Sequence, residues 1–282
     1  MKAFIESLLQ EKIVKSIPLG GGCIAHTQHI KTQSGKEFVL KQGGEGTMFL
    51  NEANGLRELK KSNTISVPTV IEAGLDFLLM EFVHQGTPHK NFFENFGVSL
   101  AQMHRFTSEN FGFYEDNFIG ATPQKNIPEN SEASDWTLFY LNKRLMFQFR
   151  LCEANGYVDD NFRKLFSNLE KRLPEILKGS EEPPALLHGD LWSGNFLTNE
   201  SGKAVLIDPA VYYGHREAEL AMTNLFGGFS SSFYNAYNKT YPLKYGWEHR
   251  EGIYTLYHVL NHLNLFGSGY RNHAIMLMKR YY

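Results

Sequence analysis

Three side chains near residue 200 combine carboxylate and amide groups at a spacing that chemistry could use. Asp190 follows an apolar pair and a His-Gly step, Asn195 comes five residues later, and Asp208 closes a second apolar run. A carboxylate can orient a hydroxyl and take its proton, while an amide oxygen and a second carboxylate are ligands suited to Mg²⁺ on nucleotide phosphates. We therefore expect Asp190 to be a catalytic base and Asn195 and Asp208 to bind magnesium.

Each of these residues alone also has an ordinary structural explanation. An acid that ends a hydrophobic strand is commonly a turn or helix cap, and His188 alone would be a satisfied, semi-buried histidine. Together they form His-x-Asp-x-x-x-x-Asn and a later Asp, the pattern of a kinase catalytic loop, so we count His188 with Asp190 as catalytic. Gly189 in place of Arg, and Asp-Pro-Ala at 208–210 in place of Asp-Phe-Gly, point away from protein kinases.

The longer stretch resembles the fructosamine kinase (ketosamine 3-kinase) family, within a superfamily that includes aminoglycoside and choline phosphotransferases. The residues that carry the resemblance are His-Gly-Asp-Leu-Trp-Ser-Gly-Asn at 188–195, Asp-Pro-Ala at 208–210 and Tyr-Tyr-Gly-His-Arg-Glu at 212–217. The resemblance implies an ATP-dependent kinase that requires Mg²⁺ and has a two-lobed α+β fold. It further implies that the acceptor is the 3-hydroxyl of a ketosamine, free or protein-bound, and that the role is deglycation.

The amino-terminal quarter supplies candidates for the nucleotide site. The glycine run Gly20, Gly21 and Gly22 could bring backbone N–H groups to phosphates, although it could also be only a turn. Lys41 ends a strand predicted over 37–42, and Glu52 falls on the apolar face of a helix predicted over 48–59. Because a carboxylate on such a face needs a partner, we expect a Lys41–Glu52 pair that holds the ammonium group on the phosphates.

The sequence predicts two lobes, a nucleotide-binding lobe at 1–83 and a catalytic and substrate-binding lobe at 84–282. A helix is expected over 2–15, and an apolar strand over 77–83 leads into the hinge. The hinge backbone that would meet the adenine edge is expected at Met80, Glu81, Phe82 and Val83.

Helical patterns over 92–107, 136–154, 158–177 and 216–226 predict that the second lobe is mainly helical. Only residues 209–215 separate Asp208 from the last of these helices, too few for a protein-kinase activation segment, which favours a small acceptor. The resemblance implies that the acid at position 219, here Glu219, braces the catalytic loop.

Several side chains keep two explanations at this stage. Trp192 could stack on the sugar or form a wedge between helices. His258 and His262 have metal-ligand spacing on a helix, but packing is the favoured explanation. Cys23 could be a redox-sensitive thiol, though a small apolar filler is favoured. Arg57 and Glu58 are expected on the solvated side of their helix.

The composition of the chain bears on which kinds of partner it could bind. The chain has 28 Lys and Arg against 30 Asp and Glu, a net charge of −2 without a basic block, so no nucleic-acid partner is expected. Two cysteines, no signal-like start and no long apolar run favour a cytoplasmic location with no membrane association. Nothing in the sequence indicates an oligomeric state.

Two rival functions stay open. One is a kinase of another small hydroxyl compound, such as an aminoglycoside, choline or a free sugar, which the narrower motifs disfavour. The other is a nucleotide-binding pseudokinase that acts as a scaffold, against which all five expected groups are present: Lys41, Glu52, Asp190, Asn195 and Asp208.

Overall fold

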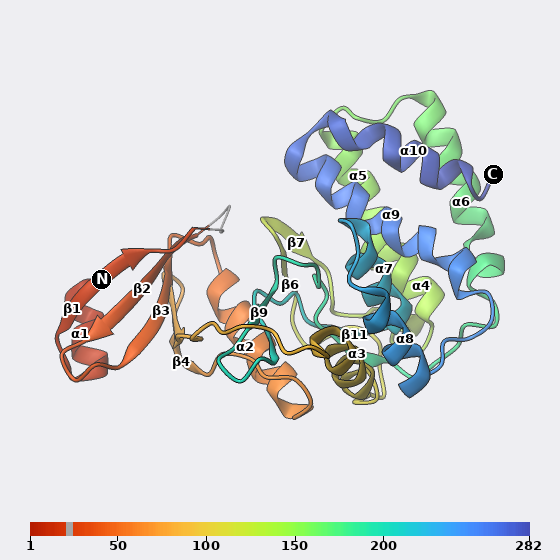
Figure 1. Cartoon of the computed structure of the whole chain (residues 1–282). Helices are drawn as coiled ribbons and strands as arrows, with labels where there is room; N and C mark the ends of the chain where they lie inside the picture. The colour runs from red at the N-terminus through yellow and green to blue at the C-terminus, as the bar shows by residue number, and fades with distance from the viewer. Residues whose placement is uncertain (21–24) are drawn as a thin grey trace.

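The computed structural model describes residues 1–20 and 25–282, so the predictions for Gly21, Gly22 and Cys23 lie outside the described residues. The first part of the chain forms an antiparallel sheet in the order β1-β2-β3-β5-β4, drawn in red and orange in Figure 1. One helix covers each face of this sheet. The elements are α1 Lys2–Leu9, β1 Ile13–Pro18, β2 His26–Thr32, β3 Glu37–Gln42, α2 Met48–Lys61, β4 Val70–Ala73 and β5 Phe77–Glu81.

Successive side chains of each strand point to opposite faces of the sheet, and this decides which helix each side chain packs against. On β5, Phe77 and Leu79 join the apolar cluster under α1, whereas Leu78 and Met80 join the cluster under α2. Val39 on β3 also packs against the α2 cluster, so Lys41, two residues later, points to the same side. The sheet therefore presents Lys41 to α2, as the sequence predicted.

The helix predicted over 2–15 is too long. α1 ends at Leu9, Gln10 takes a left-handed conformation with φ 54°, and Ile13 begins β1. Ile13 is buried in one cluster with Ile5, which lies on α1. Ile13 can pack against Ile5 from a strand as well as from a helix, so its apolar character does not distinguish the two. The left-handed residue Gln10 ends the helix before Ile13.

The prediction for Glu58 is also wrong. Its side chain is buried rather than solvated, and Glu58 Oε1 accepts a hydrogen bond of 2.9 Å from the Tyr213 hydroxyl group. Arg57 is exposed, as predicted. Tyr213 lies on β11, so this bond joins α2 to the second part of the chain.

The second part of the chain is mainly helical, and it contains the largest apolar cluster. α9 runs through its middle and packs against α5, α7 and α10 (Figure 1). The elements are α3 Phe92–Met103, β6 Asn117–Ile119, β7 Thr122–Gln124, η1 Asn130–Ala133, α4 Trp136–Tyr140, η2 Leu141–Met146, α5 Phe147–Ala154, α6 Asp160–Leu177, β8 Ala185–Leu187, β9 Phe196–Thr198, β10 Ala204–Leu206, β11 Tyr212–Gly214, α7 Arg216–Leu225, α8 Ser231–Thr240, α9 Trp247–Phe266, η3 Ser268–Tyr270 and α10 Arg271–Lys279.

The predicted helices are present with small differences. The helix expected over 136–154 is continuous but contains a π-helical segment at 141–146, and the first one ends at Met103 rather than 107. Within the described part of the chain, none of the helices has both the length and the apolarity to span a bilayer.

The close approach of α3 to α8 generates a stability prediction. A Cβ added at Gly97 on α3 would lie 2.2 Å from the Phe233 carbonyl oxygen on α8. Gly97→Ala must push the helices apart, so we expect the free energy of unfolding in urea to fall by about 1–3 kcal/mol. Gly269→Ala is the matched control, because nothing lies within 4 Å of its added Cβ. Equal effects of the two substitutions would contradict this packing argument.

Candidate active site

The three groups predicted to do the chemistry lie on two adjacent segments. Asp190 and Asn195 belong to the loop between β8 and β9, and Asp208 follows β10, which pairs with β9. The Ile207 N–H donates to the Asn195 carbonyl oxygen at 3.1 Å. The hairpin thus brings the end of the loop beside the strand end that carries Asp208.

Glu219 holds the start of the catalytic loop. Its carboxylate, buried in the first turn of α7, accepts the His188 N–H at 2.6 Å and the Gly189 N–H at 3.0 Å. These two hydrogen bonds are the bracing contacts that the family resemblance implied for Glu219. Gly189 has φ 85°, and a Cβ there would lie 2.0 Å from the Ala210 carbonyl oxygen, so this turn requires glycine.

His188 uses both ring nitrogens within the loop. Nε2 bonds to the Ile207 carbonyl oxygen at 2.8 Å, and Nδ1 accepts the Asp190 N–H at 3.3 Å. This pattern places the proton on Nε2, and burial lowers the pKa of the imidazole, which keeps it neutral. These are the contacts of a positioning residue, which orients Asp190 relative to the end of β10.

Asp190 is half-buried and unusually basic for a carboxylate. Burial raises its pKa well above the ordinary range, the Asn195 hydrogen bond opposes that rise, and the charges of Glu219 and Asp208 add to it. The Asn195 Nδ2 group donates to the Asp190 carbonyl oxygen at 2.7 Å and to Oδ2 at 3.1 Å. Because both bonds use the amide nitrogen, the amide oxygen of Asn195 is the group left for a cation.

Lys41 contacts two carboxylates. Its Nζ lies 2.6 Å from Glu52 Oε1, which confirms the predicted pair, and 2.5 Å from Asp208 Oδ1. Burial alone would lower the Lys41 pKa, but the two negative charges outweigh it and raise the pKa, so the ammonium group stays charged. Asp208 is the most exposed of the three, at 43% of its side chain, and it offers the hard oxygen ligands that Mg²⁺ prefers.

The predicted hinge follows β5. Met80 is buried in the strand, while the Glu81 N–H donates to the Thr69 carbonyl oxygen at 2.8 Å and the Phe82 N–H to the Glu37 carbonyl oxygen at 3.4 Å. Among the described residues, no group accepts from the Val83 N–H. Of these last three amides, that of Val83 is the one available to an adenine edge.

The remaining predicted positions are on the surface. Gly20 ends the described part of the glycine run, and nothing lies within 4 Å of a Cβ built there. Trp192 is 37% exposed, and its ring covers Gly194 and meets the Phe226 ring edge-on with ring centroids 5.8 Å apart. It lies partly open beside the catalytic loop rather than fully buried between helices.

The two helical histidines are arranged for packing. His258 is buried, and the His262 Nδ1 donates to the His258 carbonyl oxygen at 2.7 Å, so this nitrogen is not free for a metal. Across residues 1–20 and 25–282, no group of three or more His, Cys, Asp or Glu is placed to hold a metal ion.

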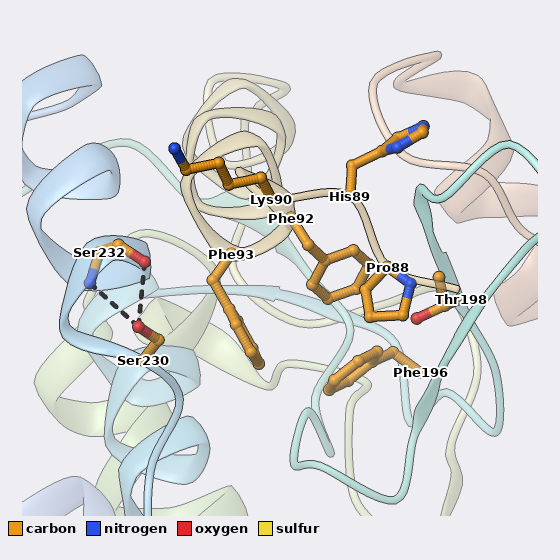
Figure 2. A pocket seen from close by; sticks show the side chains of 9 residues that line it. All are labelled: Pro88, His89, Lys90, Phe92, Phe93, Phe196, Thr198, Ser230 and Ser232. Carbon is orange, nitrogen blue, oxygen red and sulfur yellow. Dashed lines mark hydrogen bonds between the residues drawn. The ribbon is translucent and has the colours of Figure 1, made fainter. Parts of the chain in front are cut away.

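A cavity of about 340 Å³ lies beside β9 but outside the predicted catalytic set (Figure 2). Figure 2 shows the rings of Phe92, Phe93 and Phe196 below His89 and Lys90. Ser230 and Ser232, at the start of α8, line one side of the cavity. Phe196 and Thr198 line it, and Leu197 between them points to the other face of β9. The lining residues are Pro88, His89, Lys90, Phe92, Phe93, Phe196, Thr198, Ser230 and Ser232.

The fold and the site together define a two-lobed phosphotransferase of the protein-kinase-like class. An antiparallel sheet carries a Lys–Glu pair, and a helical part carries the loop with Asp190 and Asn195 and the strand end with Asp208. The sequence profile of the fructosamine kinase family matches residues 1–282, and the chain belongs to that family.

Individual proteins agree with this assignment. The chloroplastic protein-ribulosamine 3-kinase of Arabidopsis thaliana is 41% identical over 278 residues, which cover 96% of this chain and 83% of that protein. A Thermobifida fusca YX-ER1 protein, provisionally named fructosamine-3-kinase, has a crystal structure with TM-score 0.89 and 32% identity, covering 100% of this chain and 98% of that one. An aminoglycoside phosphotransferase variant solved with ADP and hygromycin B shares the fold at TM-score 0.68 and 14% identity, covering 100% of this chain and 96% of that one.

The bracing carboxylate generates a prediction about pH. If Asp190 acts as a base, kcat/KM falls as the pH drops through the pKa of Asp190, which gives the pH profile an acid limb. Because that pKa is raised, the acid limb lies above the value of about 3.9 for a free carboxyl group. Because the Glu219 charge contributes to the rise, Glu219→Gln should move the limb to lower pH. It should also lower the free energy of unfolding by roughly 1–3 kcal/mol. The measurements are kcat/KM profiles against pH and urea unfolding.

Glu217→Gln is the matched control. Glu217 is a buried acid in the same turn of α7, paired with Arg250 at 2.6 Å, and the Asp190 pKa does not depend on it. In this variant the free energy of unfolding should fall, while the acid limb of the kcat/KM profile should stay at the wild-type pH. An unmoved limb in Glu219→Gln would remove that carboxylate from the electrostatics of Asp190.

The buried lysine generates a second prediction. Lys41→Met keeps the unbranched side chain up to Cε but leaves Glu52 without its cation, so we expect the free energy of unfolding to fall by roughly 3 kcal/mol. ATP turnover should fall about 10²-fold, since charge on the phosphates is lost. Adding Glu52→Gln should restore stability without restoring turnover. Recovery of turnover in the double variant would contradict the role given to Lys41.

Proposed function

We propose that this protein is an ATP-dependent kinase that phosphorylates the 3-hydroxyl of ketosamines. The observation that carries the proposal is geometric: the Asp190 carboxylate is held in one loop with Asn195, beside the Lys41–Asp208 contact. Family membership and the ribulosamine 3-kinase relative support the choice of acceptor. Ribulosamines and fructosamines share the group concerned, a 3-hydroxyl two carbons from the amine-bearing C1.

The first lobe binds the nucleotide. The Val83 N–H meets the adenine edge, and Lys41, fixed by Glu52, bonds to phosphate oxygens. The amide oxygen of Asn195 and the carboxylate of Asp208 would hold Mg²⁺, whose charge would offset that of the phosphates. We infer that the lobes divide at residue 83, directly after β5 and the hinge amides.

Asp190 acts on the acceptor. Its carboxylate accepts a hydrogen bond from the 3-hydroxyl and then its proton, a contribution of roughly 10² to 10⁴ in rate. The hydroxyl oxygen forms a bond to the γ-phosphorus while the bond from phosphorus to the ADP oxygen breaks. His188 and Glu219 keep the carboxylate in place through the loop backbone.

The biological consequence follows from the product. A phosphate on C3 is a better leaving group than a hydroxyl, so the adduct becomes unstable and releases the amine. The proposed role is therefore deglycation of amines, including those of proteins. A cytoplasmic location, which the sequence favoured, stays a prediction.

The test is ADP release with Mg²⁺ and ATP, using a fructose–lysine or ribulose–lysine adduct, an aminoglycoside, choline or no acceptor. We expect release that depends on the ketosamine and falls below detection in Asp190→Ala, with ATP affinity by calorimetry within about three-fold of the wild type. Asp76→Ala, an exposed acid in the β4–β5 turn, is the control and should behave as the wild type.

Each other outcome has a definite meaning. Release only with an aminoglycoside, choline or a free sugar would replace the proposed acceptor and keep the kinase. ATP binding without transfer to any acceptor would favour the scaffold. Wild-type turnover in Asp190→Ala would remove Asp190 from the mechanism.

A further inference from the structure

A run of aromatic rings extends from the catalytic loop across the surface, and we call it the aromatic ledge. Trp192 meets Phe226 with ring centroids 5.8 Å apart, and Phe226 meets His262 at 4.9 Å. His262 then meets Phe266 at 5.4 Å and Tyr270 at 5.2 Å. The rings come from the catalytic loop, the end of α7, the end of α9 and η3, so only the folded chain brings them together.

Three rings of the aromatic ledge are exposed to solvent, and the other two, His262 and Tyr270, are half-buried. Trp192 is 37% exposed, Phe226 38% and Phe266 59%, with exposure greatest at the end farther from the loop. Contiguous exposed rings of this kind are uncommon on a soluble surface and mark binding sites. The ledge begins at Trp192, two residues after Asp190 in the same loop.

His262 gives the ledge one polar group with a fixed direction. Its Nδ1 donates to the His258 carbonyl oxygen at 2.7 Å, which leaves the lone pair on Nε2. Burial lowers the pKa of this half-buried imidazole, so it is neutral at pH 7. The ring thus offers a hydrogen-bond acceptor between two aromatic faces.

We propose that the aromatic ledge binds the amine-bearing arm of the ketosamine, an inference that rests on the proposed function. The arm leaves the sugar at C1, two carbons from the hydroxyl at Asp190, so it starts beside Trp192. A secondary ammonium group carries N–H donors and a positive charge, which suit the His262 acceptor and the faces of Trp192 and Phe226. An alkyl chain beyond the nitrogen then packs along Phe226 and Phe266.

The open far end of the ledge sets the range of substrates. Phe266 is more than half exposed, so a chain lying on it continues into solvent instead of meeting a wall. A lysine side chain on a peptide or a protein surface can therefore reach Asp190 with its backbone outside the site. The ledge favours long aliphatic arms without requiring a free amino acid.

The experiment compares two fructose adducts that differ only in the arm, one made from methylamine and one from Nα-acetyl-lysine amide. In the wild type we expect KM for the lysine adduct to be roughly three- to ten-fold lower, with similar kcat. Phe226→Ala and Phe266→Ala should raise KM for the lysine adduct about three-fold more than for the methylamine adduct. Phe266→Trp, which keeps an aromatic ring, and Tyr245→Ala, at a fully exposed residue outside the ledge, should both retain the preference.

The outcomes separate this proposal from the proposed function. Thermal unfolding of each variant checks that the fold is intact, which the exposure of these side chains leads us to expect. Equal KM values for the two adducts in the wild type, or equal shifts for both in the variants, would overturn the role of the ledge while leaving the kinase in place. Failure of the proposed function would instead appear as no transfer to either adduct.

Discussion

One buried cation holds the site together. The Lys41 ammonium group bonds to Glu52, 11 residues away on α2, and to Asp208, 167 residues away at the end of β10. A buried charge is costly unless it is paired, so this contact stabilises a particular placement of the sheet, of α2 and of the strand end that carries Asp208. It also makes the geometry of the first lobe depend on that of the second, because the Lys41 side chain bonds to one carboxylate in each lobe.

The catalytic loop depends on a second buried charge of opposite sign. Glu219 satisfies two consecutive backbone N–H groups at a turn whose glycine leaves no room for a side chain. Burial is the main cause of the raised pKa of Asp190, and the charge of the Glu219 carboxylate adds to it, so one residue both fixes the loop and strengthens its base. Glu219 therefore affects both the shape of the loop and the basicity of Asp190, although its own hydrogen bonds to the loop are with backbone N–H groups.

Much of the site could be predicted because its signals are local. Strand alternation put Lys41 on the α2 face, helical periodicity put Glu52 opposite it, and the spacing of Asp190, Asn195 and Asp208 lies within one short stretch. The prediction for Glu58 failed because its partner, Tyr213, is 155 residues away and cannot be seen in the pattern of one helix. The start of β1 was missed because Ile13 fits an apolar helical face as well as a strand, and only packing against the sheet decides.

The aromatic ledge could not be predicted from the sequence, because its rings come from segments far apart in the chain and meet only after folding. The most direct measurement of the central claim is the position of the transferred phosphate on a ¹³C-labelled fructose–lysine adduct, read by ¹³C and ³¹P NMR. We expect phosphorus coupling at C3 and its neighbouring carbons, with free lysine appearing as the product decays. Phosphate on any other carbon, or an unmodified adduct in the presence of ATP and Mg²⁺, would contradict it.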